Sequence, residues 1–397
     1  MKLNFFKTGF VGLFLTALIL GCNNDFKEVP YISEKEQNYI IETATGFLDS
    51  LPVTVTNAVC VRSAGGKHDF YSEGDYWWPN PEDPDGPYIR KDGQTNPGNF
   101  VAHRKAMVRF SRIIGMQTSA YLLTGNKKYV ETTHTHLEAW FVNPETRMNP
   151  NLLYVQAIKG RVTGRGIGII DAIHLIEVAR SVEILEANQA IPAESVSKIK
   201  DWFSEFINWL TTHQYGLDEM NTKNNHATCW VMQVGAFARL TQNNAVLELC
   251  RNRFKNVLLP NQMGEDGSFP LELARTKPYG YSLFNLDAFM TCAEILSDKN
   301  NNLYEFSTPD GKNMHLGAEF LYPFVKDKAS WPYNPDVMYW EEWPVRHPFL
   351  LFAGKAYDKP EYIETWKTLE GYPETREVLR NLPIRNPLLW LLNEPVN

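Results

Sequence analysis

Apolar residues recur three and four positions apart in segment after segment of this chain, and this helical periodicity restricts its fold more than any other feature. It is clear in residues 33–50, 100–125, 127–142, 171–187, 193–213, 227–242, 244–260, 282–298 and 361–371. Strand-like alternation is scarce. Short loops, as in LTQNNAVLEL, join several neighbouring segments and favour antiparallel helix pairs. The sequence therefore predicts an all-α fold, an (α/α) barrel or toroid of helix pairs.

The chain length of 397 residues allows either two domains or one large helical toroid. No fixed-period repeat is present, which argues against a solenoid. No Gly/Ser-rich or Pro-rich linker of useful length divides the chain. We therefore expect a single domain over residues 32–397, whose first helix is capped by Ser33 with Glu36 three residues on.

Three long segments, 62–100, 149–169 and 319–347, interrupt the helical pattern. Long loops without regular structure are usually functional or disordered. Their density of Trp, Tyr, Arg and Asn argues against disorder. We expect these segments to form the walls of a cleft.

Composition narrows the class of ligand. Aromatic residues make up 13% of the chain, with 11 Trp, and aromatics beyond the needs of a core often line sugar clefts. The net charge of −7 argues against a nucleic-acid partner. This net charge does not exclude a polyanionic substrate, because a basic cleft can lie within an acidic surface.

The N-terminus reads MKLNFFKTGFVGLFLTALILGCNND, a lysine-bearing start followed by an apolar run too short to span a membrane. LILGC resembles the lipobox of bacterial lipoproteins, in which the Cys becomes the lipidated first residue. We predict a signal peptide over 1–21, a lipid anchor at Cys22 and a tether over 22–31, with membrane contact only through the lipid. The protein would be an exported lipoprotein, periplasmic or anchored to the outer membrane. An ordinary secretory peptide is the alternative.

Four further cysteines, Cys60, Cys229, Cys250 and Cys292, follow in a chain where disulfides are permitted. We expect them to be free and buried, because none has C-x-x-C spacing and two lie in apolar helical patterns. No Cys/His cluster has metal-ligand spacing, so neither a metal nor another cofactor is predicted.

The stretch NNHATCW, residues 224–230, precedes a segment that looks like core. One interpretation makes Asn224 or Asn225 a helix N-cap, with His226 in the first turn. The other is a site, because a helix N-terminus favours a bound anion and these side chains would add donors to it. The stretch alone favours capping.

A second stretch, LELARTKPYGYSLFNLDAFM, places Arg275, Lys277, Tyr279 and Tyr281 just before another helix. A phenol of pKa near 10 is only about 0.1–1% ionised at pH 7–8, a deficit of roughly 3–4 kcal/mol. One Arg at about 4 Å supplies roughly that much at an effective dielectric constant of about 20. We therefore expect a Tyr beside Arg275 to be able to act as a base.

Together, NNHATCW and ELARTKPYGYSLFNLDAF resemble the paired motifs of the alginate-lyase superfamily of helical-toroid polysaccharide lyases, in particular the Bacteroidetes members of polysaccharide lyase family 38. The aromatic segment GDYWWPNP and the lipobox agree. The resemblance implies a catalytic set of Asn225, His226, Arg275 and Tyr281. Tyr279 is the alternative phenol, and family 5 lyases have Tyr-His where this chain has Tyr281-Ser282.

The chemistry that the resemblance implies is metal-independent β-elimination at a uronic acid. A base removes the C5 proton and the C4–O bond breaks, while Asn225 and His226 neutralise the carboxylate. Tyr281 would be both base and acid on mannuronate or glucuronate. On guluronate, whose C5 proton lies on the other face, His226 would be the base and Tyr281 the acid.

Further residues are candidates for substrate binding. The aromatic segment offers sugar-stacking rings followed by polar groups for neighbouring carboxylates, and GRVTGRGIG offers an anion clamp that lacks the spacing of nucleotide motifs. A packed aromatic wall with solvated charges is the alternative. The candidates are Tyr76, Trp77, Trp78, Arg90, Lys91, Gln94, His103, Arg104, Arg161, Arg165, Asn224 and Tyr279.

We predict a monomeric lyase acting on an acidic polysaccharide, alginate first and glucuronan second. A glycoside hydrolase on a helical toroid is the second choice, since it needs an acid pair and Asp171, Glu272 and Glu341-Glu342 could supply one. A lipid-anchored glycan-binding protein without catalytic activity is the third.

Overall fold

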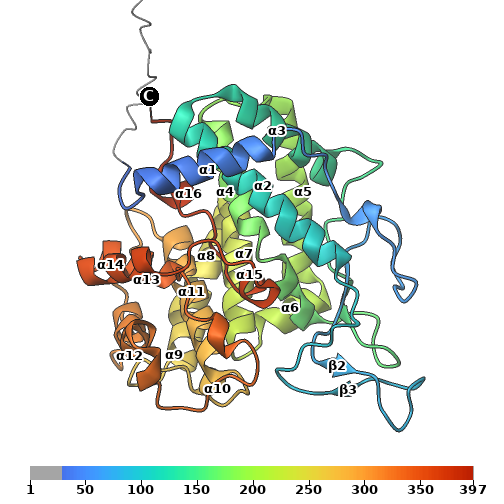
Figure 1. Cartoon of the computed structure of the whole chain (residues 1–397), viewed down its shortest axis with the longest axis vertical. Helices are drawn as coiled ribbons and strands as arrows, with labels where there is room; N and C mark the ends of the chain where they lie inside the picture. The colour runs from blue at the N-terminus through green and yellow to red at the C-terminus, as the bar shows by residue number, and fades with distance from the viewer. Residues whose placement is uncertain (1–28, 397) are drawn as a thin grey trace, which may run out of the picture.

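The computed structural model describes residues 29–396, and helices form most of it (Figure 1). The α-helices are α1 (Glu34–Gly46), α2 (Ala102–Thr124), α3 (Lys127–Leu137), α4 (Leu175–Ala187), α5 (Ala193–Thr212), α6 (Gln214–Met220), α7 (Asn225–Leu240), α8 (Asn244–Arg253), α9 (Leu259–Gln262), α10 (Pro270–Leu273), α11 (Pro278–Leu296), α12 (Met314–Lys326), α13 (Pro348–Ala356), α14 (Pro360–Thr368), α15 (Arg376–Arg380) and α16 (Leu388–Leu391). The predicted all-α toroid of helix pairs is confirmed.

Short 3₁₀ and π turns link these helices. They are η1 (Val55–Asn57), η2 (Glu138–Val142), η3 (Gly166–Ala172), η4 (Phe254–Leu258), η5 (Lys328–Ser330) and η6 (Trp340–Glu342). At α1, Ser33 is the N-cap and its side chain accepts a hydrogen bond from the Glu36 backbone, as predicted.

Helices α7 and α11 are largely buried and pack against each other in the middle of the fold. Almost every residue of α11 is buried, as is expected of a helix that is apolar on all sides. Helices α4, α5, α6 and α8 surround α7, and α10, α12 and α13 pack on α11. The two sequence motifs therefore lie at the N-termini of two adjacent inner helices.

The strands are short and confined to the long loops. Strand β1 (Tyr71–Glu73) pairs in parallel with β4 (Tyr154–Ala157), which joins the loop 62–100 to the loop 149–169. Strands β2 (Trp77–Trp78) and β3 (Ile89–Arg90) form an antiparallel hairpin that projects from the helices (Figure 1). The β1–β4 ladder thus joins two of the loop walls to each other.

One predicted boundary is wrong. The segment 319–347 was expected to be non-helical, but α12 continues to Lys326. Leu321 and Val325 lie four residues apart and are buried, so tertiary packing keeps this turn helical although Pro323 lies inside it. Beyond Lys326 the segment is loop with two 3₁₀ turns.

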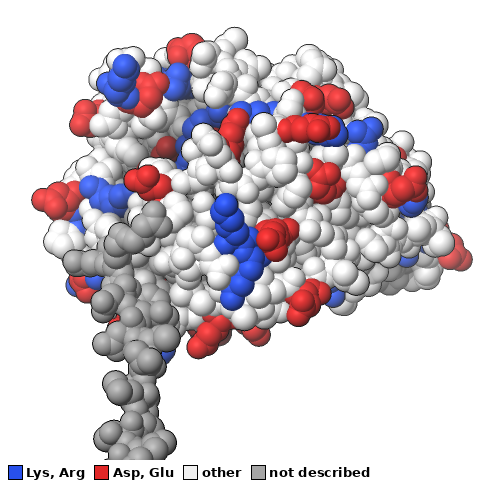
Figure 2. Space-filling view, turned by 90° about the horizontal axis from the view of Figure 1, so that it is seen from above, with Lys and Arg blue, Asp and Glu red and all other residues white. Residues whose placement is uncertain are grey.

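Cys60, Cys229, Cys250 and Cys292 are free and buried, as predicted. The predicted signal peptide, Cys22 and most of the predicted tether lie outside the described residues. Within residues 29–396, no helix is both long enough and apolar enough to span a bilayer. On the face shown in Figure 2, basic and acidic side chains are interspersed among other residues, so charge of one sign does not dominate this face.

Candidate active site

A cavity of about 160 Å³ lies where the N-termini of α7 and α11 meet the loop walls. All four predicted catalytic residues, Asn225, His226, Arg275 and Tyr281, line it. The predicted binding residues Tyr76, Trp77, Arg90 and Arg165 line it too. The remaining lining residues are Asp75, Gln156, Ile167, Ile170, Phe284, Arg380 and Asn381.

Asn225 is held by a buried carboxylate. Glu272 Oε1 accepts hydrogen bonds from the Asn225 backbone N–H at 2.8 Å and from its Nδ2 at 2.9 Å, and Glu272 Oε2 lies 2.9 Å from the same Nδ2. Asn224 is the N-cap residue of α7 but makes no side-chain capping bond. The predicted N-cap position at Asn224, with His226 in the first turn, is confirmed, but a carboxylate from α10 and not an Asn side chain binds the orphan N–H.

His226 is oriented by a second buried carboxylate. Its Nδ1 lies 2.8 Å from Glu219 Oε1, and Glu219 is completely buried while the His226 ring remains 18% exposed. Burial raises the pKa of Glu219, and His226 opposes this effect. When Nδ1–H donates to Glu219, Nε2 has a free lone pair and can accept a proton in the cavity.

Tyr281 lies between a second phenol and two cations. Its hydroxyl is 2.5 Å from the Tyr76 hydroxyl, and Arg275 Nη2 donates to it at 3.4 Å. The Arg275 guanidinium also lies 4.4 Å from the Tyr281 ring centre, and Lys277 Nζ lies 5.1 Å from it.

The pKa of Tyr281 is nevertheless raised well above that of a free phenol. Burial is the largest cause and Tyr76 adds to it, while Lys277 and Arg275 oppose them. The expectation that one Arg would supply the missing stabilisation of a phenolate is wrong here, because desolvation outweighs it. Before substrate binds, Tyr281 is a protonated phenol suited to act as an acid.

Arg275 also forms an ion pair with Asp92, which follows strand β3 of the hairpin. Its Nη2 lies 3.2 Å from Asp92 Oδ1, and Thr276 Oγ1 donates to Asp92 Oδ2 at 3.0 Å. Burial alone would raise the pKa of Asp92, but Arg275 outweighs it and the pKa is lowered. Asp92 thus anchors the hairpin loop over the catalytic helix end.

Arginines give the cavity a surplus of positive charge. Arg165 donates through Nε to the Gln156 carbonyl and through Nη2 to Gln156 Oε1, both at 3.0 Å, and no carboxylate among the described residues pairs with it. Burial lowers the pKa of Arg165 to about 10. A carboxylate on a ligand would complete this site, since guanidinium binds carboxylate through two parallel hydrogen bonds.

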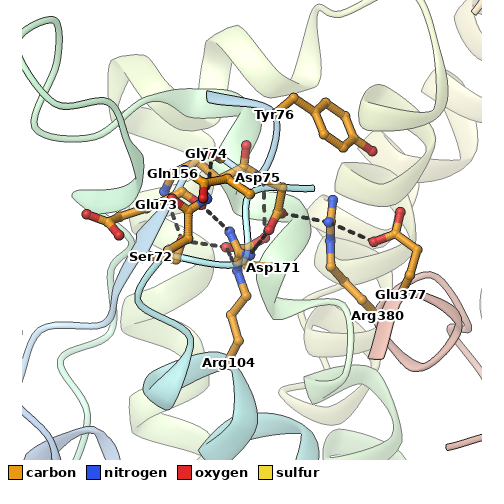
Figure 3. A network of polar contacts seen from close by, with 12 residues as sticks. Ser72, Glu73, Gly74, Asp75, Tyr76, Arg104, Gln156, Asp171, Glu377 and Arg380 are labelled. Carbon is orange, nitrogen blue, oxygen red and sulfur yellow. Dashed lines mark hydrogen bonds and ion pairs between the residues drawn. The ribbon is translucent and has the colours of Figure 1, made fainter. Parts of the chain in front are cut away.

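An ion-pair network forms the base of the cavity (Figure 3). Arg104 donates to both carboxylate oxygens of Asp75 and to Asp171 Oδ2, at 2.7 to 2.8 Å. Arg380 Nη1 lies 2.6 Å from Asp75 Oδ2 and 3.2 Å from Glu377 Oε2. Burial would raise the pKa of Asp75, but Arg104 and Arg380 hold it at about 2.

The sequence matches the family described as alginate lyase over residues 54–331. The chain belongs to the alginate lyase family. A crystal structure of an alginate lyase from Bacteroides ovatus is 30% identical, with a TM-score of 0.78 over 89% of this chain and 92% of that chain. Comparison with curated proteins gave no match.

Alginate lyase A1-III shares the fold at lower similarity. A His-to-Ala variant complexed with tetrasaccharide is 12% identical, with a TM-score of 0.51 over 86% of this chain and 91% of that chain. The predicted resemblance to the superfamily is confirmed, and this chain is a polysaccharide lyase. Membership of family 38 stays a prediction.

Eight predicted binding residues of this lyase are not brought to the cavity. Trp78, Lys91 and Gln94 lie together on the hairpin, where Trp78 Nε1 donates to the Gln94 carbonyl and Lys91 Nζ lies 4.9 Å from the Trp78 ring. Arg161 covers the Trp77 ring at 5.1 Å. The Asn224 carbonyl accepts a hydrogen bond from Gln262.

The other three are internal residues of the lyase. His103 bonds through Nδ1 to the Tyr71 N–H and through Nε2 to the Ala58 carbonyl. Arg104 uses its donors in the network of Figure 3. The Tyr279 hydroxyl donates to the Phe324 carbonyl. Their polar atoms are already occupied, so the structure corrects the expectation that they contact substrate.

The acid pair of a hydrolase is not found in this cavity. Asp171 lies in the buried network, Glu272 holds Asn225, and the Glu341 side chain is 88% exposed. Glu342 accepts a hydrogen bond from Thr375. None of the four lines the cavity that contains Asn225, His226, Arg275 and Tyr281.

Sequence reasoning missed the residues that support the site: Glu219, Glu272, Asp92, Asp75, Gln156, Arg380 and Asn381. Only Glu219 carried a local signal, as an acid seven residues before His226. Within residues 29–396, no three His, Cys, Asp or Glu side chains are grouped as metal ligands.

Proposed function

We propose that this lyase cleaves a polyuronate by metal-independent β-elimination, with alginate as its first substrate and glucuronan as its second. The observation that carries the proposal is that one cavity contains Asn225, His226, Arg275 and Tyr281 together with Arg90 and Arg165. The arginine side chains can donate hydrogen bonds to a substrate carboxylate. His226 and Tyr281 can each accept a proton from the substrate or donate one to it. The similarity to an alginate lyase from Bacteroides ovatus supports the choice of polymer.

The reaction needs one base and one acid. The base takes the C5 proton, the electrons of the C5–H bond form the C4=C5 double bond, and the C4–O4 bond breaks. The departing O4 takes a proton from the acid, so no water enters the products. Neutralising the carboxylate on C5 lowers the barrier, because the carbanion next to it adds a second negative charge.

Tyr281 supplies the proton to O4 on every substrate. On guluronate its raised pKa keeps that proton in place until O4 departs, and Tyr76, 2.5 Å away, can hold the hydroxyl in one orientation. Arg165 binds the carboxylate, since it lines the cavity together with His226 and has no carboxylate partner among the described residues. Asn225 lines the same cavity, with its Nδ2 held by Glu272.

The identity of the base depends on the sugar. On guluronate, His226 Nε2 takes the C5 proton while Glu219 stabilises the imidazolium that forms. On mannuronate or glucuronate, C5–H and O4 lie on one face, so Tyr281 first loses its own proton to solvent, then takes the C5 proton and passes it to O4. Arg275 and Lys277, within 5.1 Å of the Tyr281 ring, stabilise that phenolate.

Mass spectrometry of the products tests the reaction class. Purified protein is incubated with defined alginate oligosaccharides in the presence of a chelator. Elimination gives fragments whose masses sum to that of the substrate. Fragments heavier by one water, or no cleavage, would overturn the proposal.

We also propose that Cys22 carries a lipid that anchors the lyase after export, and that the protein acts as a monomer. The supporting feature is the LILGC sequence at 18–22. Incorporation of labelled fatty acid into the wild type but not into Cys22→Ser would support the anchor, and equal labelling would contradict it. Sedimentation at equilibrium tests the monomer.

A further inference from the structure

A second cavity, of about 450 Å³, lies beside the ion-pair network of Figure 3. It shares Arg380 with the catalytic cavity but is lined by none of Asn225, His226, Arg275 or Tyr281. Its walls come from one face of α2, from Phe47 after α1, from α15 and from Arg385. Its volume is that of a typical small-molecule site.

The lining is strongly cationic. Seven of its residues are Lys or Arg, whereas only Asp171 and Glu374 are acidic. Arg104 and Arg380 are neutralised within the network of Figure 3. Within residues 29–396 the other five have no carboxylate within 4.0 Å: Lys105, Arg109, Arg112, Arg376 and Arg385. The network therefore leaves most of the positive charge of this cavity uncompensated.

Two buried nitrogens of the lining also lack partners. His174 is 2% exposed, and its Nδ1 has no hydrogen-bond partner in the described structure. The same is true of Arg385 Nε, although Nη2 of Arg385 donates to Ser111 Oγ. Buried polar nitrogens without partners cost free energy, and a bound acceptor would offset this cost for the Arg385 Nε–H donor.

Glu177, a buried acid whose charge acts on Arg385, does not fill this role. Glu177 accepts hydrogen bonds from the backbone N–H and Nδ2 of Asn386, both at 2.8 Å. Burial lowers the pKa of Arg385, and Glu177 opposes this only in part. Arg385 is thus a buried cation whose neighbouring carboxylate is already engaged.

The cavity also has an apolar side. Phe47, Val108 and Leu379 line it, and the Arg112 guanidinium lies 5.8 Å from the Phe47 ring centre. Stacking on a ring limits the orientations of a guanidinium and leaves its edge free for an oxyanion. A ligand with both a carbon skeleton and an anionic group fits such a lining.

We propose that this cavity is a second anion site, which binds a small molecule bearing a carboxylate or phosphate group between α2 and α15. Arginine and lysine side chains bind both groups, because both present oxygens that accept paired hydrogen bonds. The ligand is bound separately from the polymer in the catalytic cavity, since the two linings have only Arg380 in common and Asp75 of the catalytic cavity is ion-paired with Arg104 of this one.

Calorimetric titration of the mature protein with inorganic phosphate and, separately, with D-mannuronate at constant ionic strength tests the proposal. Two variants alter the cavity in different ways. Lys105→Gln/Arg376→Gln removes two exposed charges. Val108→Trp fills the space and keeps every charge. The matched control, Lys35→Gln/Lys299→Gln, removes two exposed lysines that do not line the cavity.

We expect the wild type and the control to bind at least one of the two anions equally well, and both cavity variants to bind it about tenfold more weakly or worse. Binding of phosphate alone assigns a phosphorylated ligand, and binding of mannuronate alone assigns a sugar acid. No binding of either anion by the wild type, or equal affinities in the control and both cavity variants, would overturn the proposal. Circular dichroism of each variant confirms that it is folded.

Discussion

The hydroxyl groups of Tyr281 and Tyr76 lie 2.5 Å apart, although 205 residues separate them in the chain. Tyr281 comes from the first turn of α11, whereas Tyr76 comes from the loop that leads into β2. This contact joins the catalytic helix to the cleft wall and places a second phenol where it raises the pKa of the first.

Replacing Tyr281 with Phe should reduce kcat by about 10²–10⁴-fold, because the acid for O4 is lost. Binding of oligosaccharide should persist, since the ring and Arg275 remain. Steady-state kinetics and calorimetry on the same preparation separate the two effects.

Tyr279→Phe is the matched control. The Tyr279 hydroxyl donates to the Phe324 carbonyl away from the cavity, so its loss should cost about 1 kcal/mol of stability and leave turnover unchanged. If Tyr281→Phe kept its activity and Tyr279→Phe lost activity, the assignment of the two phenols would be reversed.

Glu219→Gln should lower kcat on polyguluronate by about 10²-fold or more while KM changes little. The amide can donate to His226 Nδ1, which places the ring proton on Nε2 and removes the lone pair from the cavity. Activity on polymannuronate should fall less, because Tyr281 is the base there. An equal loss on both polymers would argue for a purely structural role of Glu219.

The pH dependence should differ between the two polymers. The folded pKa of Tyr281 is raised well above 10, so its phenolate fraction rises about tenfold per pH unit throughout the range below that pKa. The kcat/KM on polymannuronate, which needs the phenolate, should therefore rise steadily from pH 7 to 9. On polyguluronate, which needs the phenol, it should not show this rise. Parallel profiles would contradict the assignment of two different bases.

Arg165→Gln should lower kcat/KM by about 10- to 100-fold, mostly through KM, because a buried cation that binds the substrate carboxylate is lost. The pKa of Arg165, lowered to about 10 by burial, marks this charge as uncompensated before substrate binds. Arg161→Gln is the control, since this exposed residue covers the Trp77 ring and does not line the cavity. Equal losses in both variants would argue against a specific carboxylate contact.

Asp75→Asn should lower the free energy of unfolding at pH 7 by about 3–5 kcal/mol, because Arg104 and Arg380 lose a buried partner. The folded pKa of Asp75 is about 2, below its ordinary value of 3.8. The wild type therefore has this stabilisation above about pH 4 and loses about 2 kcal/mol as the pH falls towards 2.

Denaturant titrations of the wild type and Asp75→Asn at several pH values measure this effect. The variant should lose less stability than the wild type between pH 4 and pH 2. Asp201→Asn, at an exposed position of α5, is the control and should follow the wild type. Identical acid sensitivity in all three proteins would contradict the role of Asp75.

Helical periodicity was enough to predict the fold class, because each helix buries its own apolar face whatever its neighbours are. The two motifs were also found correctly at adjacent helix ends. Helical periodicity did not predict the C-terminal end of α12. Pro323 and scattered aromatic residues interrupt the apolar pattern there, so the buried positions Leu321 and Val325 were not recognised.

Within the site, the sequence left Tyr279 and Tyr281 as alternatives. In a helix, two positions apart means about 200° of rotation, so only one of them can face the cavity. Choosing between Tyr279 and Tyr281 required knowing that α11 begins at Pro278, and the sequence did not show this.

The supporting carboxylates were missed because their partners lie far away in the chain. Glu272 reaches Asn225 across 47 residues, and Asp92 reaches Arg275 across 183. The predicted direction of the Tyr281 pKa shift was wrong because only one of its causes can be read from the sequence. The sequence shows Arg275 nearby, which lowers the pKa, but it does not show the extent of burial, which raises the pKa more.

The most direct test of the account is the ultraviolet absorbance of unsaturated products while purified mature protein acts on polymannuronate, polyguluronate, glucuronan and a pectin, each with and without chelator. The account predicts a rise on the two alginate polymers that survives the chelator and is abolished by Tyr281→Phe but not by Tyr279→Phe. A flat trace on both alginate polymers, or a rise that the chelator removes, would contradict it.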